Sequence, residues 1–331
     1  MSLDILNQEP FRFLLSFAAV LFLVLNLAAI LTMAERKVSA YIQLRYGPNR
    51  VGPRGLLQPA ADVFKLFTKE NVSPSRADLW IFLLAPIAMF IPAAAVWLVI
   101  PFAPGAVVAD LNIAIVFFIA ITSIGALGVI MAGYGSRSNF SLLGALRGAA
   151  QMISYEVPLI LSLLGIVMLT GSLSLVDVVD AQAGGFWHWY FLPQFPMFVA
   201  FYVAGLAEAR RVPFDLPEGE SEIVGGFMVE YSGMTWALIQ AAEFASMALI
   251  SAITAILFFG GWQPPIDALD LGNFNWVWFG LKTSLIIFTF QWVRWSLPRL
   301  RMDQLMDFGW KILVPLTLVW LFVTAGVMLI V

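Results

Sequence analysis

Residues 231–259 read YSGMTWALIQAAEFASMALISAITAILFF, and Glu243 is the only charged residue among them. A helix of about 20 apolar residues crosses the hydrocarbon core of a bilayer, which is roughly 30 Å thick. We therefore expect this stretch to form a membrane-spanning helix. A carboxyl group at such a depth is costly unless it is protonated, hydrated or paired, so Glu243 marks a candidate functional site inside the membrane.

Seven other stretches have the same apolar character. The chain is 61% hydrophobic and 12% charged, against roughly 45–50% and about 25% in soluble domains. This composition excludes an ordinary soluble enzyme and a disordered chain. The first stretch is long and has no basic segment before it, so we expect a retained span rather than a signal peptide. The sequence predicts an all-α integral membrane protein, with residues 1–331 as a single polytopic membrane domain and eight transmembrane helices near 13–34, 79–101, 112–134, 152–172, 193–208, 231–259, 273–293 and 312–331.

The basic residues are distributed unevenly between the two sides of the predicted membrane domain. Sixteen of the 18 Lys and Arg residues fall in four segments, and the loops that alternate with them carry none. Basic residues concentrate in cytoplasmic loops. Eight spans then place both termini on the periplasmic side of a bacterial inner membrane. The four segments expected to face the cytoplasm are 35–78, 137–150, 208–230 and 294–311.

The chain offers few ligands for a redox centre. It contains no Cys, and His188 is its only His. Iron–sulfur clusters need cysteine thiolates, and structural zinc needs about four Cys or His ligands. We therefore expect no cofactor and no metal on this chain. His188 is predicted between Trp187 and Trp189 on the outer side, where an interfacial role is expected rather than catalysis.

The first cytoplasmic segment contains a predicted amphipathic helix over residues 56–69. Its apolar positions recur with helical spacing, and polar residues occupy the other face. It is too short to span the membrane and should lie at the membrane surface. The preceding basic loop, RYGPNRVGPRG, either touches lipid headgroups or frames, together with this helix, an opening for an amphipathic molecule. The apolar face holds Leu56, Ala60, Val63, Phe64 and Phe67, and the polar face holds Gln58, Asp62, Lys65 and Lys69.

Three acids are predicted within the cytoplasmic half of the membrane domain. Glu156 is placed about one turn inside the fourth span, Glu208 at the end of the fifth, and Glu243 near the middle of the sixth. Acids from three spans can converge only around a polar cavity. The functional interpretation is a proton or cation path, which is the default for intramembrane carboxylates. A salt bridge between packed helices is the alternative, with Lys282 as a candidate partner.

The third cytoplasmic segment, residues 208–231, reads EARRVPFDLPEGESEIVGGFMVEY. Its many acids are opposed by only Arg210 and Arg211. Mutual repulsion is expected to raise some of their pKa values, so that they take up protons near neutral pH. Interspersed apolar residues indicate packing rather than a fully solvated loop. The acids are Glu208, Asp215, Glu218, Glu220, Glu222 and Glu230.

These segments together resemble a known family. GLLQPAADVFKLF at 55–67 and PFDLPEGESEIVGG at 213–226 are similar to the two signature stretches of the H subunit of the proton-translocating NADH:quinone oxidoreductase, respiratory complex I. Three further segments extend the resemblance over nearly the whole chain, with no departure at the positions of interest. They are AERKVSAYIQLRYGPNRVGPRG at 34–55, SYEVPL at 154–159 and WVRWSLPRLRMDQLM at 292–306.

The resemblance implies a membrane subunit without a prosthetic group that forms the floor and wall of a quinone chamber. Quinone would be the substrate, while FMN and iron–sulfur clusters would lie on partner subunits of the peripheral arm. The partners implied are other membrane-arm and peripheral-arm subunits, quinone and the lipid bilayer, with no nucleic acid. By this resemblance the opening and chamber would be bordered by Glu35, Arg36, Arg45, Asp62, Phe67, Asp215, Glu218, Glu220 and Glu222, and the proton path would contain Glu156, Glu208, Glu230 and Glu243.

Two other classes of protein are compatible with buried acids. A proton-coupled secondary transporter is the main alternative, but such proteins often show inverted repeats and paired broken helices, and neither is evident in the sequence. An integral-membrane hydrolase or prenyltransferase would need a metal-binding acid pair or a nucleophile with its base. Purification in mild detergent separates these classes, because a complex I subunit brings flavin and iron–sulfur absorbance with it.

Overall fold

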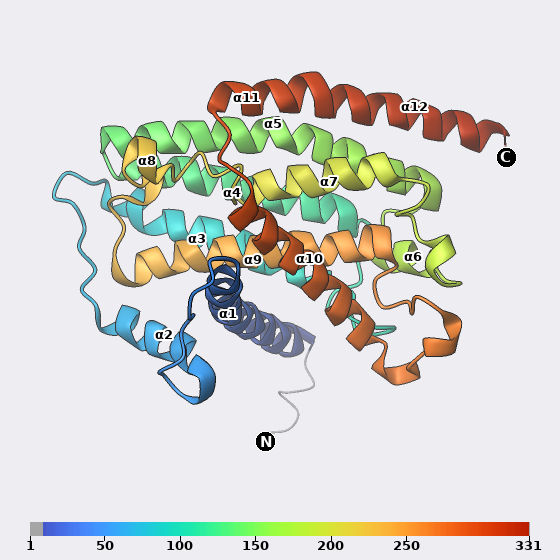
Figure 1. The fold of residues 1–331 in the computed structure, drawn as a ribbon, viewed down its shortest axis with the longest axis horizontal. Coiled ribbons are helices and arrows are strands. Elements are labelled where there is room, and N and C mark those ends of the chain that lie inside the picture. Colours follow the sequence, from blue (N-terminus) through green and yellow to red (C-terminus); the bar gives the residue numbers. More distant parts are fainter. Residues whose placement is uncertain (1–8, 331) are drawn as a thin grey trace.

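The computed structural model describes the backbone of residues 9–330, and the side chains of residues 14–330 except 220, 221, 267 and 273. Within this part, the regular secondary structure is helical apart from one isolated bridge between Ala103 and Ala106 (Figure 1). The helices are α1 Glu9–Ile42, α2 Gln58–Thr68, α3 Leu79–Ala95, α4 Ala114–Gly135, α5 Asn139–Thr170, α6 Leu175–Asp180, α7 Phe195–Glu208, α8 Glu220–Ile223, α9 Gly233–Phe259, α10 Trp276–Ser296, α11 Met302–Phe308 and α12 Val314–Ile330.

Every predicted span corresponds to a helix, and the structure confirms an all-helical membrane protein. Six helical segments within the described residues are long and apolar enough to cross a membrane: α1, α3, α4, α5, α9 and the continuous α11–α12 segment. The helices of the other two predicted spans do not meet both conditions. α7 is apolar but has only 14 residues, and α10 has 21 residues but is less apolar. The number of eight spans therefore stays a prediction.

The predicted cytoplasmic segment 137–150 is largely helical. α4 ends at Gly135 and α5 already begins at Asn139, ahead of the span predicted at 152–172, and the position of the membrane boundary along α5 stays a prediction. The cause lies in its composition, since residues 139–151 contain no Pro and only one charged residue, Arg147. Hydropathy marks where the apolar run begins rather than where the helix begins. Glu156 consequently lies near the middle of α5 and not one turn from its end.

The surface helix in the first cytoplasmic segment is present. α2 begins at Gln58 rather than at residue 56, because Leu57 ends a turn and Pro59 occupies the first helical turn. A proline there loses no hydrogen bond, since the first amides of a helix have no intrahelical partner.

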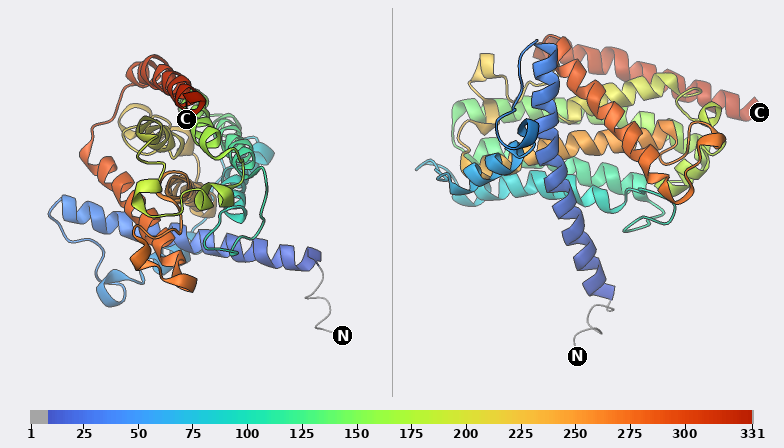
Figure 2. Two further views of the ribbon diagram at one scale, coloured as in Figure 1. Left: turned by 90° about the vertical axis from the view of Figure 1, so that its right-hand side faces the viewer. Right: turned by 60° about the horizontal axis from the view of Figure 1, so that its bottom comes forward.

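α9 lies at the centre of the bundle. It packs against α1, α2, α3, α6, α7 and α10, and nearly all of its residues from Ile239 onward are buried. Figure 2 shows the other helices arranged around it, with α3 and α4 together on one flank and α10 on the other. This position explains why the stretch with the single acid is apolar on every face, which a helix surrounded by other helices requires.

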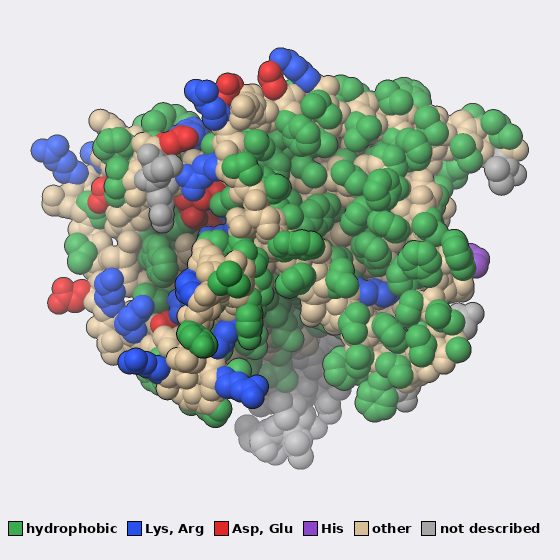
Figure 3. All heavy atoms as spheres, in the orientation of Figure 1, with side chains coloured by type: hydrophobic (Ala, Val, Ile, Leu, Met, Phe, Trp, Pro, Cys, Tyr) green, Lys and Arg blue, Asp and Glu red, His purple; other side chains and the backbone are tan. Residues whose placement is uncertain are grey.

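Charged residues gather at one end of the bundle. On the face shown in Figure 3, Lys, Arg, Asp and Glu cluster around the end where α2 and α8 lie, and hydrophobic side chains cover most of the opposite end. The helices thus bring the four basic segments of the sequence to the same end. Which side of the membrane this end faces stays a prediction.

Candidate functional site

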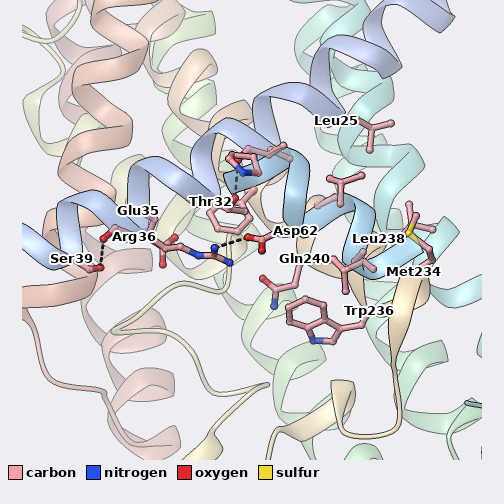
Figure 4. A pocket seen from close by; sticks show the side chains of 18 of the residues that line it. Leu25, Thr32, Glu35, Arg36, Ser39, Asp62, Met234, Trp236, Leu238 and Gln240 are labelled. Carbon is pink, nitrogen blue, oxygen red and sulfur yellow. Dashed lines mark hydrogen bonds and ion pairs between the residues drawn. The ribbon is translucent and has the colours of Figure 1, made fainter. Parts of the chain in front are cut away.

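A cavity of about 500 Å³ opens at the charged end, between α1, α2, α9 and α10 (Figure 4). α1 contributes residues from Leu25 to Ser39, and α9 contributes residues from Met234 to Phe244. Most of its wall is apolar, and six of the residues that line it are charged: Glu35, Arg36, Arg45, Asp62, Arg211 and Arg294. Five residues named from the sequence line this one cavity: Glu35, Arg36, Arg45, Asp62 and Phe67.

An ion pair joins the two helices at the mouth of the cavity. Arg36 on α1 reaches Asp62 on α2, with 2.5 Å between Nη1 and Oδ2. Gln58 donates to the other carboxylate oxygen of Asp62 at 3.0 Å. Figure 4 shows this pair with Gln240 and Trp236 of α9 beside it. The pair fixes α2, which has no fully buried residue of its own, against the bundle.

Glu35 lies at the inner end of the cavity and is 7% exposed. Its carboxylate is 2.5 Å from Arg294 Nη1 and 3.4 Å from Arg211 Nη1. The guanidinium of Arg211 also lies 4.2 Å from the ring centre of Phe244. Two cations around one anion leave a net positive charge, which in a poorly hydrated place favours a negative or electron-rich group nearby.

Acids of the loop between α7 and α9 lie close to this cluster of Glu35, Arg211 and Arg294. Asp215 pairs with Arg299 at 2.7 Å, yet burial raises the pKa of Asp215 to about 6 against the opposing charge of Arg299. Burial also raises the pKa of Glu218 well above its ordinary value, and the charge of Glu243 adds to this. The expected upward shifts are thus present at these two acids, but desolvation rather than mutual repulsion is their largest cause.

Glu243 connects the loop to the interior. It is 1% exposed and lies 4.0 Å from Arg210 Nη2. Arg210 and Glu208 line a small, mostly apolar cavity between α3, α4, α5, α7 and α9. The charge of Glu156 on α5 acts on Glu208, and Glu156 accepts a hydrogen bond from Ser123 on α4.

These side chains form a row that starts at the loop and ends within the membrane domain. We refer to Glu218, Glu243, Arg210, Glu208 and Glu156 as the buried acid row; Glu243 and Arg210 are buried, and the other three are half-buried. The three acids expected to converge, on α5, α7 and α9, follow one another along this row. Only Glu208 of the three lines the small cavity, so their convergence around one polar cavity stays a prediction. A guanidinium between the acids offsets part of their repulsion.

The remaining acids named from the sequence lie elsewhere. Glu222 is exposed and pairs with Arg147 at 2.6 Å. Glu230 is half-buried, and no ion pair joins it to another residue in the described part of the chain. The side chain of Glu220 lies outside the described residues.

Lys282 does not pair with any of the buried acids. Its ammonium donates to the carbonyls of Phe259 and Gln263 at 2.6 Å and of Gly261 at 3.0 Å. It also lies 4.1 Å from the ring centre of Trp189. These carbonyls belong to the end of α9 and the turn after it, where a cation complements the helix dipole. Lys282 thus joins α10 to the C-terminal end of α9 and to the turn that follows it.

Sequence reasoning misses the basic partners of the acids. In the sequence, Arg210, Arg211, Arg294 and Arg299 serve only as indicators of topology, whereas each lies beside a buried carboxylate. The sequence does contain a signal that could have identified these partners. Arg210 and Arg211 stand within the acidic segment, and Arg294 and Arg299 stand in WVRWSLPRLRMDQLM. Among the described residues, no group of three or more His, Asp or Glu side chains is arranged to hold a metal ion.

Fold and site together define a multi-pass, all-helical membrane protein with an amphipathic cavity beside a buried row of acids. A family model described as NADH dehydrogenase matches residues 15–325. The H subunit of NADH-quinone oxidoreductase from Rubrobacter xylanophilus is 78% identical over 331 residues, covering 100% of both chains. The protein of the same name from Rhodospirillum rubrum is 50% identical over 312 residues, covering 93% of this chain and 91% of its own. The chain belongs to this H-subunit family and is a component of the NADH-quinone oxidoreductase complex.

Proposed function

We propose that this subunit forms much of the quinone-binding chamber and couples quinone reduction to proton translocation. The observation that carries the proposal is the cavity lined by Glu35, Arg36, Arg45, Asp62 and Phe67. Its mostly apolar wall suits the hydrophobic body of a quinone, and its few polar groups suit the carbonyl oxygens, as in other sites for amphipathic small molecules.

The inner end of the cavity offers hydrogen-bond donors to such a head group. Arg211 lines the cavity, and its Nε and Nη2 atoms are buried without a hydrogen-bond partner in the described part of the chain. A quinone carbonyl placed there would accept from Arg211. Donors left unpaired in a buried place are costly, so a ligand that pairs them gains affinity.

The buried acid row gives the proton part of the proposal. Reduction of a quinone takes up two electrons and two protons. The electrons would come from FMN and iron–sulfur clusters on partner subunits of the peripheral arm. Burial raises the pKa of Asp215 to about 6, so this acid exchanges protons near neutral pH. Burial also raises the pKa of Glu218 well above its ordinary value, and Glu243 continues the row into α9. Asp215, Glu218, Glu220 and Glu222 are assigned to the chamber loop, and Glu156, Glu208, Glu230 and Glu243 to the proton path.

The first experiment tests the mouth of the cavity. Arg45→Ala and Phe67→Glu should lower NADH:quinone activity several-fold but leave electron transfer from NADH to an artificial hydrophilic acceptor unchanged, because neither residue is near the electron donors. Phe64→Glu and Arg50→Ala are matched controls, since these exposed residues belong to the same segments but do not line the cavity. Equal losses in both assays, with the complex assembled, would contradict a role at a quinone opening.

Membership in this family argues against the secondary-transporter alternative. A transporter purifies alone or with copies of itself. The curated relatives are subunits of an oxidoreductase, and the same is expected here. Purified from native membranes in mild detergent, this chain should carry flavin and iron–sulfur absorbance with it.

A further inference from the structure

A second cavity lies on the outer flank of the bundle, away from the quinone site. It is a groove of about 360 Å³ between α3 and α4, the two helices grouped on one flank in Figure 2. Every residue that lines it is apolar. Leu84, Ile87 and Ile91 of α3 form one side, and Ile121 and Ile124 of α4 form much of the other.

The groove exists because α3 and α4 approach closely beneath it. A methyl group added at Gly135 would lie 2.8 Å from the backbone nitrogen of Phe82, and one added at Gly128 would lie 3.0 Å from that of Met89. Small residues allow such approach in membrane proteins. The larger side chains of Ile87, Ile91 and Ile124 stand outward on both sides and remain exposed.

A basic hollow lies at the charged end of the same flank. Arg76, Asp78 and Trp80 from the start of α3 line it together with Arg137, which follows α4. Within the described residues, neither Arg76 nor Arg137 forms an ion pair. Two arginines and one aspartate give the hollow a net charge of about +1 at neutral pH.

The hollow and the groove share one face of α3. Trp80, Leu84, Ile87 and Ile91 follow one another at i, i+4, i+7 and i+11, which is one side of a helix. From Trp80 to Ile91 the helix rises about 16 Å, close to half of the roughly 30 Å hydrocarbon core. Trp80 is 82% exposed, and tryptophan is enriched at the level of lipid headgroups.

We propose that this flank binds one anionic glycerophospholipid. Its phosphate lies between Arg76 and Arg137, and one acyl chain fills the groove between α3 and α4. Guanidinium groups pair with phosphate oxygens through two parallel hydrogen bonds. The single net positive charge of the hollow matches the single negative charge of such a lipid.

The charge of the hollow favours a lipid over an apolar helix of a partner subunit. Side chains of such a helix could fill the groove, but they would leave the net positive charge of the hollow uncompensated. An anionic lipid supplies both the apolar chain and the negative charge.

Photolabelling of the intact complex tests the proposal. The complex is reconstituted into phosphatidylcholine vesicles containing a trace of phosphatidylglycerol with a diazirine in its acyl chain. Illumination should label peptides of α3 and α4 around Ile87, Ile91 and Ile124. Arg76→Gln/Arg137→Gln should lower this labelling at least five-fold, and Arg50→Gln/Arg54→Gln, a matched pair from the first cytoplasmic segment, should leave it unchanged.

Further experiments test which part of the site binds the lipid and whether another ligand occupies it. Ala88→Trp fills the groove and should abolish labelling while the arginines remain. A phosphatidylcholine probe should label at least five-fold less than the phosphatidylglycerol probe, and equal labelling would overturn the anionic headgroup. Loss of labelling on adding inorganic phosphate would show a free-phosphate site instead. Crosslinks from a photoreactive residue at position 91 to another subunit, without lipid labelling, would show that a protein covers this flank.

Discussion

Glu243 is held in the centre of α9 by Arg210 and the loop acid Glu218, not by Lys282. Glu243→Gln keeps the shape and most hydrogen bonds but removes the titratable group. If the side chain exchanges protons, the variant should assemble and lose quinone reductase activity and proton pumping together by more than ten-fold. Glu243→Asp should retain part of both.

The control for Glu243 is Glu70→Gln, because Glu70 is exposed and is assigned neither to the chamber loop nor to the proton path. This variant should keep near-normal rates. Both activities are measured in inverted vesicles and normalised to assembled complex. A Glu243→Gln complex with wild-type rates of both would falsify the proton-path assignment and leave only a packing role.

Lys282 gives a prediction of the opposite kind, in which stability changes and coupling does not. Lys282→Met leaves three carbonyls at the end of α9 and in the turn after it without their donor, one of them buried and two part-buried. The expected loss is about 2–4 kcal/mol, seen as a lower temperature of heat-induced release of this subunit from the purified complex. Lys65→Met, at an exposed lysine of α2, should not shift it. Lost pumping at unchanged stability would show that Lys282 serves the acids after all.

At the scale of residues, the acids can be identified from the sequence, whereas their basic partners cannot. A carboxylate within an apolar run is conspicuous, so Glu156, Glu208 and Glu243 could be named directly. Arg211 stands in a charged segment and Arg294 in the last turn of α10, where a charge is ordinary, and only three-dimensional packing brings both to Glu35. Exposure separates Glu222 from Glu218 within one acidic loop, and no pattern in the sequence encodes that difference.

At the scale of elements, α2 depends on α1 for its position. The Arg36–Asp62 pair is the ion pair that joins the two helices, and both side chains are partly exposed, so about 0.2–1 kcal/mol is expected from it. Arg36→Asp should raise the KM for quinone about two- to five-fold by loosening the cavity mouth. Arg36→Asp/Asp62→Arg should restore much of the loss.

The double variant is compared with both single variants in membranes of equal complex content, using the artificial acceptor to normalise. Additive effects of the two changes would mean that the pair does not position α2. A change in kcat with constant KM would place Arg36 or Asp62 in the reduction step rather than at the opening.

Hydropathy locates the centres of the helices but not their ends. The centres of the eight predicted spans are all helical, because apolar runs of that length have few other structures. α5 begins well before its apolar run, and α11–α12 continues through a single π-helical turn at Gly309–Leu313. Hydropathy is lower in these extensions than in the spans, and backbone hydrogen bonds and packing decide there whether a helix continues.

At the scale of the whole molecule, the segregation of basic segments predicts topology. The chain has no Cys, so a single introduced cysteine in this subunit is unambiguous after gel separation. In right-side-out vesicles, an impermeant thiol reagent should label Ala183→Cys but not Arg54→Cys or Arg301→Cys. Position 183 is chosen because it is exposed, whereas the neighbouring Gln182 is buried. The converse labelling would reverse the orientation of the subunit.

The Glu35 cluster also constrains how the subunit is made. Glu35 belongs to α1, whereas Arg211 follows 176 residues later and Arg294 later still. At a synthesis rate of about 5–20 residues per second, Glu35 waits roughly 9 to 35 seconds for its first counter-charge. The span predicted at 13–34 ends just before Glu35, so its carboxylate can stay hydrated at the membrane surface while the rest of α1 inserts. Burial of Glu35 is therefore a late step of biogenesis, which takes place only when the segments that carry Arg211 and Arg294 arrive.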